Sequence, residues 1–556
     1  MAEKRSAKTT AKKSAGKATE KVAEQSGAKT KTSKSPAEVS SKKAAKKSGS
    51  KKGLVWGLIG VGLAAVAGIV VALVLNLNQN GTVGDPTAML SYSRSFFISD
   101  DNKYTLWNAD GQRLTKDEYS EITNFVGGYA RVKKDNQYGV LREDGKPTVE
   151  FGKYGMITNQ GGLYLAQDGN TKTYYLITGA GGILAQGSDL KVYAPSNQSA
   201  GFAAAEMDGK LRVYNYAGKL MTEIQVADDA EEPTFSSAKD FGVMYYAGQS
   251  TVFDARSGAM MATLAGAEYS FDSVSDDRTI IILENESEDG KYKMLRGGRI
   301  YDLDEAKYYS IADRDIIIGY NSYSELALLN NDYKVATWVD SYLQLKDIYN
   351  YATENKDGRA EIYRNGEKIK EFGEDSNVAA SGVLYEDYYA IEEGGKAMFY
   401  NLDGSVGINH EFKEIKSIFR EHHHAVVSDA EGEYYLIDAK GNRVGDATAA
   451  SISIRDGGYE LKNSDGKYAI ANTAGKLVTE FKYTSTYYRD DAEPRNIWTG
   501  RISDKSFDVV DVASGKFILT DVNVDGFYAN YFKVKNADGK TEYYTYDGKL
   551  FYTSVK

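Results

Sequence analysis

The histidines of this chain are few and are concentrated at one place. The sequence has four His, and His422, His423 and His424 are consecutive. If this segment is a strand, His422 and His424 project from the same face, because side chains alternate along a strand. Two imidazoles on one face are the beginning of a zinc site. Glu421 would point to the opposite face, so we predict a polar strand edge here rather than a metal site.

A second pattern of metal-ligand types lies near the C-terminal end of the chain. Asp521, Asn523, Asp525 and Gly526 match the start of a calcium loop. The twelfth position of such a loop supplies a bidentate carboxylate, but here it is Phe532. A polar turn accounts for the same residues more simply. We therefore predict no resident metal ion and no cofactor.

Common catalytic motifs are missing from the sequence. The Gly-Lys-Thr at 539–541 lacks the earlier Gly of a phosphate-binding loop, and neither G-x-S-x-G nor H-E-x-x-H occurs. The absence of Cys excludes disulfides and thiolate chemistry. We predict that the protein is not an enzyme. Because Asp and Glu are abundant, a glycoside hydrolase that uses two carboxylates is the main enzymatic alternative.

Tyrosine is unusually frequent, with 43 residues. Seven adjacent pairs occur, each of which would place one ring on each face of a strand. Such rings suit sugar or protein recognition, and they suit packing between repeated units equally well. Packing is the favoured interpretation, because a repeated structure demands repeated contacts. The pairs are at 174–175, 245–246, 308–309, 388–389, 434–435, 487–488 and 543–544.

The elements that carry these residues come from a repeat. Its unit is an aromatic or aliphatic strand, a polar turn that ends in Gly, and a second strand. Most steps between the turn glycines are 33 to 40 residues, and the 108-residue interval from Gly258 to Gly366 leaves room for two degenerate copies. About thirteen units result. The turns predict tight two-residue hairpins in which both central residues have positive φ. The turn glycines are Gly111, Gly145, Gly181, Gly218, Gly258, Gly366, Gly404, Gly441, Gly475, Gly515 and Gly548.

One unit is more detailed than the others. Residues 128–151 contain a strand that begins after Gly128, then Tyr138-Gly139, then the turn Asp144-Gly145, then a final short strand. This order resembles the unit of the bacterial WG-repeat family. A second copy, at 458–483, has Tyr468-Ala469 where the aromatic-Gly pair belongs. The resemblance implies a repeat-built β scaffold and carries over no catalytic residue.

A unit of about 36 residues has room for three or four short strands and cannot cover its own apolar face. We therefore predict an all-β ectodomain of tandem β-propellers, with one β-repeat domain at 91–325 and a second at 326–556. The join is expected near 318–335, where the repeat is most degenerate. An open β-superhelix is the alternative.

The N-terminal part of the chain has a different composition. Residues 1–52 carry a net charge of +12, and the remaining residues carry −22. This stretch has too few apolar side chains to form a core, so we predict a disordered cytoplasmic tail. Its charge permits weak binding to anionic lipid or nucleic acid, but a solvated tail that only orients the protein in the membrane is the favoured interpretation. Residues 53–75 contain no charge and are long enough to span a bilayer. Lys51 and Lys52 precede them, which predicts a signal-anchor with the N-terminus in the cytoplasm.

Small residues recur on one face of this predicted transmembrane helix. Gly60, Ala64, Gly68 and Ala72 are four residues apart, a spacing that permits a homodimer contact and that is also common in membrane helices generally. The common composition is the favoured interpretation. A polar linker, 76–90, leads to the repeats. The sequence therefore predicts a single-pass cell-membrane protein whose extracytoplasmic scaffold binds an unidentified protein or envelope glycan.

Overall fold

The computed structural model describes residues 93–226, 230–312, 316–322, 325–340, 343–420, 422–488 and 496–555. All of them belong to one compact unit, Asp85–Lys556. Within these ranges the chain forms forty-nine strands and no helix. The prediction of an all-β repeat body is confirmed for the described residues.

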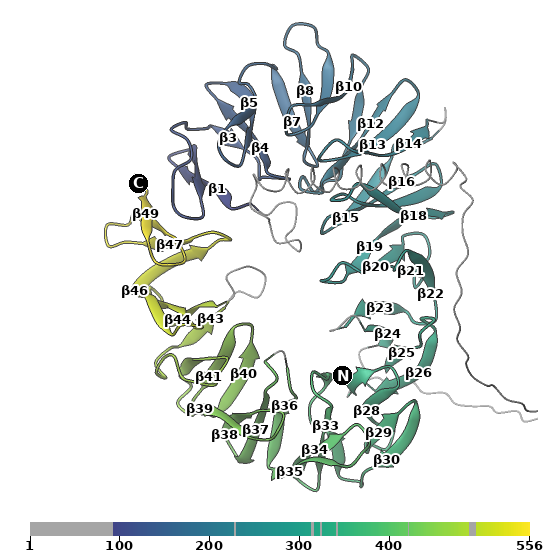
Figure 1. Cartoon of the computed structure of the whole chain (residues 1–556), viewed down its shortest axis with the longest axis vertical. Helices are drawn as coiled ribbons and strands as arrows, with labels where there is room; N and C mark the ends of the chain where they lie inside the picture. Colours follow the sequence, from purple (N-terminus) through teal and green to yellow (C-terminus); the bar gives the residue numbers. More distant parts are fainter. Residues whose placement is uncertain are drawn as a thin grey trace, which may run out of the picture. The chain divides into compact units, whose positions relative to one another are not determined.

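The strands are grouped into small antiparallel sheets that follow one another along the chain (Figure 1). The sheets of the first half are β1 (Ser95–Asp100) and β2 (Lys103–Asn108); β3 (Glu121–Ile122), β4 (Tyr129–Lys134), β5 (Gln137–Arg142) and β6 (Pro147–Val149); β7 (Met156–Gln160), β8 (Leu163–Gln167), β9 (Tyr174–Ile177) and β10 (Ile183–Gly187); β11 (Lys191–Tyr193), β12 (Phe202–Met207), β13 (Lys210–Asn215) and β14 (Leu220–Gln225); β15 (Thr234–Ala238), β16 (Phe241–Tyr246), β17 (Gln249–Asp254) and β18 (Ala259–Ala265); β19 (Tyr269–Val274), β20 (Ile280–Asn285), β21 (Tyr292–Arg296) and β22 (Arg299–Leu303); β23 (Tyr308–Ile311), β24 (Ile317–Ser322), β25 (Glu325–Leu329) and β26 (Val335–Asp340). Those of the second half are β27 (Leu343–Asp347), β28 (Asn350–Glu354), β29 (Ala360–Arg364), β30 (Glu367–Glu371) and β32 (Gly382–Val383); β31 (Ser376–Val378), β33 (Tyr388–Glu393), β34 (Lys396–Asn401) and β35 (Val406–Phe412); β36 (Glu414–Ser417), β37 (Ala425–Ala430), β38 (Glu433–Ile437) and β39 (Arg443–Ala449); β40 (Ser451–Arg455), β41 (Gly458–Lys462) and β42 (Tyr468–Asn472); and finally β43 (Ser485–Tyr487), β44 (Ile497–Ser503), β45 (Ser506–Asp511), β46 (Lys516–Phe527), β47 (Phe532–Lys535), β48 (Thr541–Tyr544) and β49 (Leu550–Thr553).

The usual sheet is a four-stranded meander in which each strand pairs with the next one along the chain. One exception is β32, which adds to β27 in parallel. Another is the long strand β46, which pairs with β45 on one side and with β47 on the other, so that two four-stranded sheets share it. If the two sheets that share β46 are counted separately, the described residues form thirteen sheets, in agreement with the predicted number of units.

The middle strands of the sheets are buried on both faces, which explains their continuous apolar sequences. In β20, Ile280 and Ile282 join a core cluster with Tyr309 of the following sheet. Ile281 and Leu283 of the same strand join a different cluster, with Phe241 of the preceding sheet. Because side chains alternate along a strand, one run of apolar residues serves two neighbours at once.

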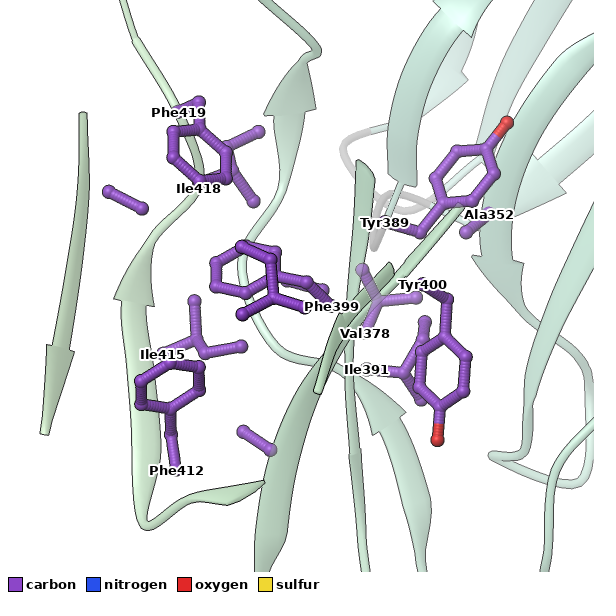
Figure 2. Close-up of a cluster of buried hydrophobic side chains, with 14 of the residues drawn as sticks. Ala352, Val378, Tyr389, Ile391, Phe399, Tyr400, Phe412, Ile415, Ile418 and Phe419 are labelled. Atoms are coloured by element: carbon purple, nitrogen blue, oxygen red, sulfur yellow. The ribbon is translucent and has the colours of Figure 1, made fainter. Parts of the chain in front are cut away.

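The largest core cluster connects three consecutive sheets. It contains Tyr389, Phe399 and Phe412 from the sheet of β31–β35, and Ile415 and Phe419 from the sheet that follows. Figure 2 shows these rings and aliphatic groups facing one another from adjacent sheets. Each sheet alone would leave this surface in water, so stability depends on stacking.

The turns between the last two strands of many units differ from the prediction. At Asn108–Gln112 the Gly111 N–H donates to the Asn108 carbonyl at 3.0 Å, and Gly111 alone among the turn residues has positive φ, at 70°. This is a three-residue turn with a glycine bulge, not a two-residue turn. The Asn108 Oδ1 accepts the N–H groups of Asp110 and Gln112, at 3.1 and 2.8 Å. That side-chain bonding favours the longer turn.

The first sheet packs against the last. Ile98 and Trp107 share a core cluster with Tyr531 and Tyr543. The Phe96 and Tyr531 rings stack with centroids 4.5 Å apart. In addition, Asn530 Nδ2 donates to the Ser93 carbonyl at 2.8 Å. The row of sheets therefore returns to its starting point through direct contact.

This contact repeats the contacts made between internal neighbours. A Cβ placed on Gly111 would lie 2.7 Å from Phe551 Cβ, just as one placed on Gly441 would lie 2.8 Å from Ile408 Cγ2 of the preceding sheet. The Lys549 Nζ donates to the Asp110 carbonyl at 3.1 Å, and Lys219 Nζ makes the matching bond to the next turn at 2.8 Å. The first and last sheets thus make the same kinds of contact as two internal neighbours.

The predicted division between 91–325 and 326–556 falls inside strand β25, so the structure places no domain boundary there. Leu328 of this strand joins a cluster with Leu343 and Leu345 of the following sheet. Ala327 and Leu329 join the cluster of the preceding sheet. The degenerate sequence near 318–335 still forms a sheet with the normal contacts on both sides, because burial depends on apolar character rather than on the turn signature.

Candidate functional site

The three consecutive histidines lie in a turn before β37, not on the expected strand edge. His423 has a φ of 58°. The rings contact different groups: His422 Nε2 donates to the Arg455 carbonyl at 3.0 Å, and His423 Nδ1 bonds Glu386 at 2.6 Å. His424 Nδ1 lies 2.5 Å from the Tyr459 hydroxyl, and burial lowers the pKa of His424. Within the described ranges, no group of three His, Asp or Glu side chains is arranged to hold a metal ion.

The residues of the calcium-loop pattern lie along the extended strand β46, so the expected turn is wrong at this position. Asp525 is 3.6 Å from Lys533 and 3.5 Å from Lys535. The Asp521 carboxylate accepts a bond from the Ser506 hydroxyl at 2.6 Å. The strand is extended because it pairs with strands of two sheets. Its acidic side chains contact residues of the neighbouring strands of the same chain.

The predicted tail 1–52, the transmembrane segment 53–75 with Gly60, Ala64, Gly68 and Ala72, and the linker 76–90 lie outside the described residues. In the part of the chain that the structure covers, no helix has the length and apolar character needed to cross a membrane.

The first strand of each sheet, which we call its leading strand, differs from the buried middle strands. The leading strands β15, β40 and β43 contain mostly half-buried or exposed residues. Their sequences, TFSSA, SISIR and STY, are rich in hydroxyl groups. Neighbouring leading strands approach one another: the Phe271 N–H of β19 donates to Ser236 Oγ of β15 at 3.3 Å. The leading strands β15, β40 and β43 therefore present polar, accessible side chains beside the apolar core.

One pocket, of about 350 Å³, lies between the leading strands β15 and β19. Its charged lining residues, Glu268 and Glu286, are both acidic. The Thr234 hydroxyl donates to Glu268 Oε1 at 2.5 Å. The pocket is completed by Phe235, Ser236, Val243, Tyr245, Tyr269 and Ser270.

A second pocket, of about 410 Å³, occupies the corresponding place between the leading strands β36 and β40. Its charged lining residues, Lys416 and Arg420, are both basic. The other lining residues are Ser417, Ser451, Ile452, Ser453 and Ile454. Both volumes are in the range of small-ligand sites, and both pockets combine hydroxyl groups with a few charged or apolar side chains.

Several leading strands contain a bulge at a charged residue. The ladder of β19 shifts around Asp272, that of β27 around Lys346, and that of β36 around Lys416. A bulge leaves one residue outside the pairing register and redirects its side chain. Lys346 forms an ion pair with Asp387, whereas Lys416 lines the second pocket.

The tyrosine pairs serve mainly in packing. Tyr389 is fully buried, and Tyr388 packs against the Phe399 and Phe419 rings with centroids 6.3 and 5.8 Å apart. The Tyr309 hydroxyl accepts the N–H of Ala306 at 2.8 Å. Tyr308, the other member of that pair, is exposed.

No family model matches the sequence, and no curated protein matches it significantly. Among solved structures, the computationally designed Ika8 protein aligns with 57% of this chain and 95% of its own chain, at 11% identity and a TM-score of 0.20. A likeness at this level carries no argument about fold or function.

Neither pocket is among the candidate sites that the sequence indicates, which are the histidine cluster and the calcium-loop pattern. The signal that could have found the second pocket is the alternation Ser451-Ile452-Ser453-Ile454, which places the two isoleucines on one face of a strand. The bulge at Lys416 and the neighbouring sheet could not be inferred from that alternation.

Proposed function

We propose that this protein is a single-pass membrane protein whose β-repeat body is an extracytoplasmic scaffold that binds a protein or an envelope glycan. The observation that carries the proposal is the recurrence of hydroxyl-lined pockets between neighbouring leading strands. Hydroxyls and a few charged groups on a rigid framework suit the recognition of polar ligands. The uncharged segment 53–75 and the basic tail support a signal-anchor with the N-terminus in the cytoplasm.

The same proposal includes how the sheets are arranged and which repeat family they resemble. Four-stranded meanders and the packing of the first sheet on the last support a closed, β-propeller-like repeat in place of two tandem rings. The order of residues in 128–151 supports membership of the bacterial WG-repeat family.

The test uses the full-length chain in detergent, on a glycan array and in a crosslinked pull-down from envelope material. We expect saturable binding of at least one envelope glycan or protein. A control variant with Ser236→Ala and Ser270→Ala in the first pocket should distinguish specific from non-specific retention. Failure to bind in both assays would overturn the scaffold function.

A second candidate, an extracytoplasmic glycoside hydrolase, is favoured by the bulged residue Asp272. Asp272 is exposed, but the partial loss of its hydration and the charge of Glu284 both raise the pKa of its carboxyl. A carboxyl with a raised pKa beside a second carboxylate is what a glycosidic general acid requires. Release of reducing ends from an envelope glycan, abolished by Asp272→Asn, would establish this activity.

The tail and the predicted helix add two further partners to the proposal. Residues 1–52 would contact anionic lipid or nucleic acid weakly through their charge. The face of Gly60, Ala64, Gly68 and Ala72 would form a homodimer contact. An unchanged oligomer size in detergent after Gly68→Leu would count against the dimer.

A further inference from the structure

We infer that the turns between the last two strands of successive sheets, which we call the turn row, form a surface that faces an anionic lipid bilayer. This inference rests on the proposed membrane anchor and specifies which surface of the body meets the membrane. It assigns contact with the bilayer interface to exposed apolar side chains, and contact with the anionic headgroups to the basic residues beside them.

Exposed apolar side chains recur at the same place in the repeat. Of the seventeen large apolar residues that are exposed in the described ranges, ten lie two or three positions after the last positive-φ glycine of such a turn. Examples are Ile183, Met260 and Val406, which are 51%, 54% and 46% exposed. A single exposed apolar residue is ordinary, but a set of them gathered at one place on a protein is typical of an interaction surface.

Basic residues stand directly beside these apolar side chains. Residues 53–556 carry a net charge of −22, so acidic residues outnumber basic ones over this part of the chain. Nevertheless, six of the ten apolar residues directly follow a Lys or Arg, and none directly follows an Asp or Glu. An apolar group with a neighbouring cation matches the interface of an anionic bilayer. The six residues are Leu220, Ile300, Ile369, Leu477, Phe517 and Leu550.

The acidic residues of the turn row are used within the turns themselves. The Asp438 Oδ1 accepts the N–H groups of Lys440 and Asn442, at 2.9 and 2.8 Å. The Asp403 Oδ1 likewise accepts the Ser405 N–H at 3.0 Å. These carboxylates maintain the shape of the turns, whereas Lys476 and Lys516 are exposed.

Contacts between neighbouring turns make the row continuous from one sheet to the next. Lys219 Nζ donates to a carbonyl of the following turn at 2.8 Å, and Lys370 and Lys549 do the same at 3.0 and 3.1 Å. Each bond connects the segment that follows one turn to the turn of the next sheet. The apolar and basic side chains of these sheets therefore lie along one edge of the body.

The described chain begins at this same edge. Ser95 pairs with Asn108, the residue that begins the first of these turns. The Ser93 hydroxyl donates to Glu143, in the corresponding turn of the next sheet, at 3.0 Å. The predicted transmembrane helix is joined to Ser93 by residues 76–92, which extend to at most about 60 Å. The proposed anchor is therefore attached to the body beside the turn row.

A bilayer fits the turn row better than a folded partner protein does. The exposed apolar residues come mostly one to a sheet and are separated by polar turns. A protein interface has a contiguous buried core of apolar side chains, which this pattern lacks. A bilayer interface accepts separate apolar side chains and attracts the basic residues beside them.

The experiment uses the full-length chain in nanodiscs of phosphatidylcholine and phosphatidylglycerol, with one spin label. Because the protein has no Cys, a label on Leu477→Cys is unique. The matched control is Asp465→Cys, in an exposed turn at the other end of β42 in the same sheet. We expect the label at position 477 to collide more with oxygen, which concentrates in the bilayer, than with a water-soluble nickel chelate. The label at position 465 should show the reverse.

The role of the basic residues is tested with the label at position 477. Lys516→Gln, or nanodiscs without phosphatidylglycerol, should lower the ratio of oxygen to nickel collisions by about twofold or more, because attraction to the headgroups is lost. Lys505→Gln, in the turn at the other end of β45, should leave the ratio unchanged. An unchanged ratio for Lys516→Gln and in uncharged nanodiscs would show that the anionic lipid is not recognised.

Two further results would overturn the inference while the anchor stands. Equal exposure of both labels to the nickel chelate would show that the turn row does not meet the bilayer. Shielding of the label at position 477 from oxygen and nickel alike would show that protein, not lipid, covers the row. If the chain does not remain with the nanodiscs at all, the proposed anchor fails and the orientation fails with it. Thermal melting of each variant confirms that it is folded.

Discussion

At the scale of single residues, buried acidic groups in this protein are held by several partners. Glu361 on β29 is 5% exposed. It accepts hydrogen bonds from Asn355 Nδ2 at 2.9 Å and Tyr363 Oη at 2.7 Å, and it lies 3.0 Å from Lys368 Nζ. Burial by itself raises the pKa of Glu361, but these partners outweigh it and lower the pKa below its ordinary value. Burial and the nearby Glu361 raise the pKa of Tyr363 to about 12.

The lowered pKa of Glu361 predicts a pH-dependent contribution to stability. A carboxylate with a depressed folded-state pKa stabilises the protein above its unfolded pKa, and this stabilisation is lost as the pH falls through the folded value. We expect Glu361→Gln to cost about 1–3 kcal/mol at neutral pH. The difference from the unchanged protein should shrink as the pH falls below 4.5, the ordinary value for this group.

Thermal unfolding followed by circular dichroism at a series of pH values would measure this difference. Glu433→Gln, on an exposed position of β38, serves as the control and should show little difference at any pH. A constant difference for Glu361→Gln from neutral to acidic pH would contradict the assignment.

At the scale of elements, the turn glycines have two separate roles. One role is conformational, because positive φ is costly for residues with a Cβ. The other is the close approach of the neighbouring sheet. Gly441 and Gly432 separate the two roles: both have positive φ, 80° and 75°, but only Gly441 has a neighbour within 4 Å, at Ile408.

We therefore expect Gly432→Ala to cost about 1–2 kcal/mol, the conformational penalty alone. Gly441→Ala should cost at least about 1 kcal/mol more, because the new methyl overlaps Ile408 and the packed sheets must shift. Urea unfolding of the two variants measures the difference. Equal costs would mean that the sheet contact at Gly441 is not maintained in solution.

At the scale of the whole body, the contact between the first and last sheets determines whether the repeat is closed. Trp107 is 7% exposed because rings of the last sheet cover it. If the contact forms in solution, Trp107→Ala should destabilise the body by about 3–5 kcal/mol, as removal of a buried aromatic residue does.

Chemical denaturation gives this value, with Trp338→Ala as the matched control. Trp338 on β26 is 36% exposed, so its removal should cost much less. A similarly small effect for both tryptophans would show that the first sheet is not covered and that the row of sheets is open.

The sequence by itself determined the local features of this protein. Strand and turn signals are short-range, so the glycines from Gly111 to Gly548 predict the all-β class and the number of sheets. The type of turn was predicted incorrectly at Gly111, because the bonding of the Asn108 side chain was not taken into account. The charge difference between 1–52 and the rest of the chain likewise predicts a cytoplasmic N-terminus.

Only the tertiary structure decided which distant residues meet. The contact of Trp107 with Tyr552 joins segments from opposite ends of the chain, and no periodicity encodes which sheet covers which. The same holds for the second pocket, which is lined both by Lys416, at a bulge of β36, and by residues of β40. Repeats make every unit resemble every other in sequence, so closure and site position depend on the accumulated packing of all the sheets.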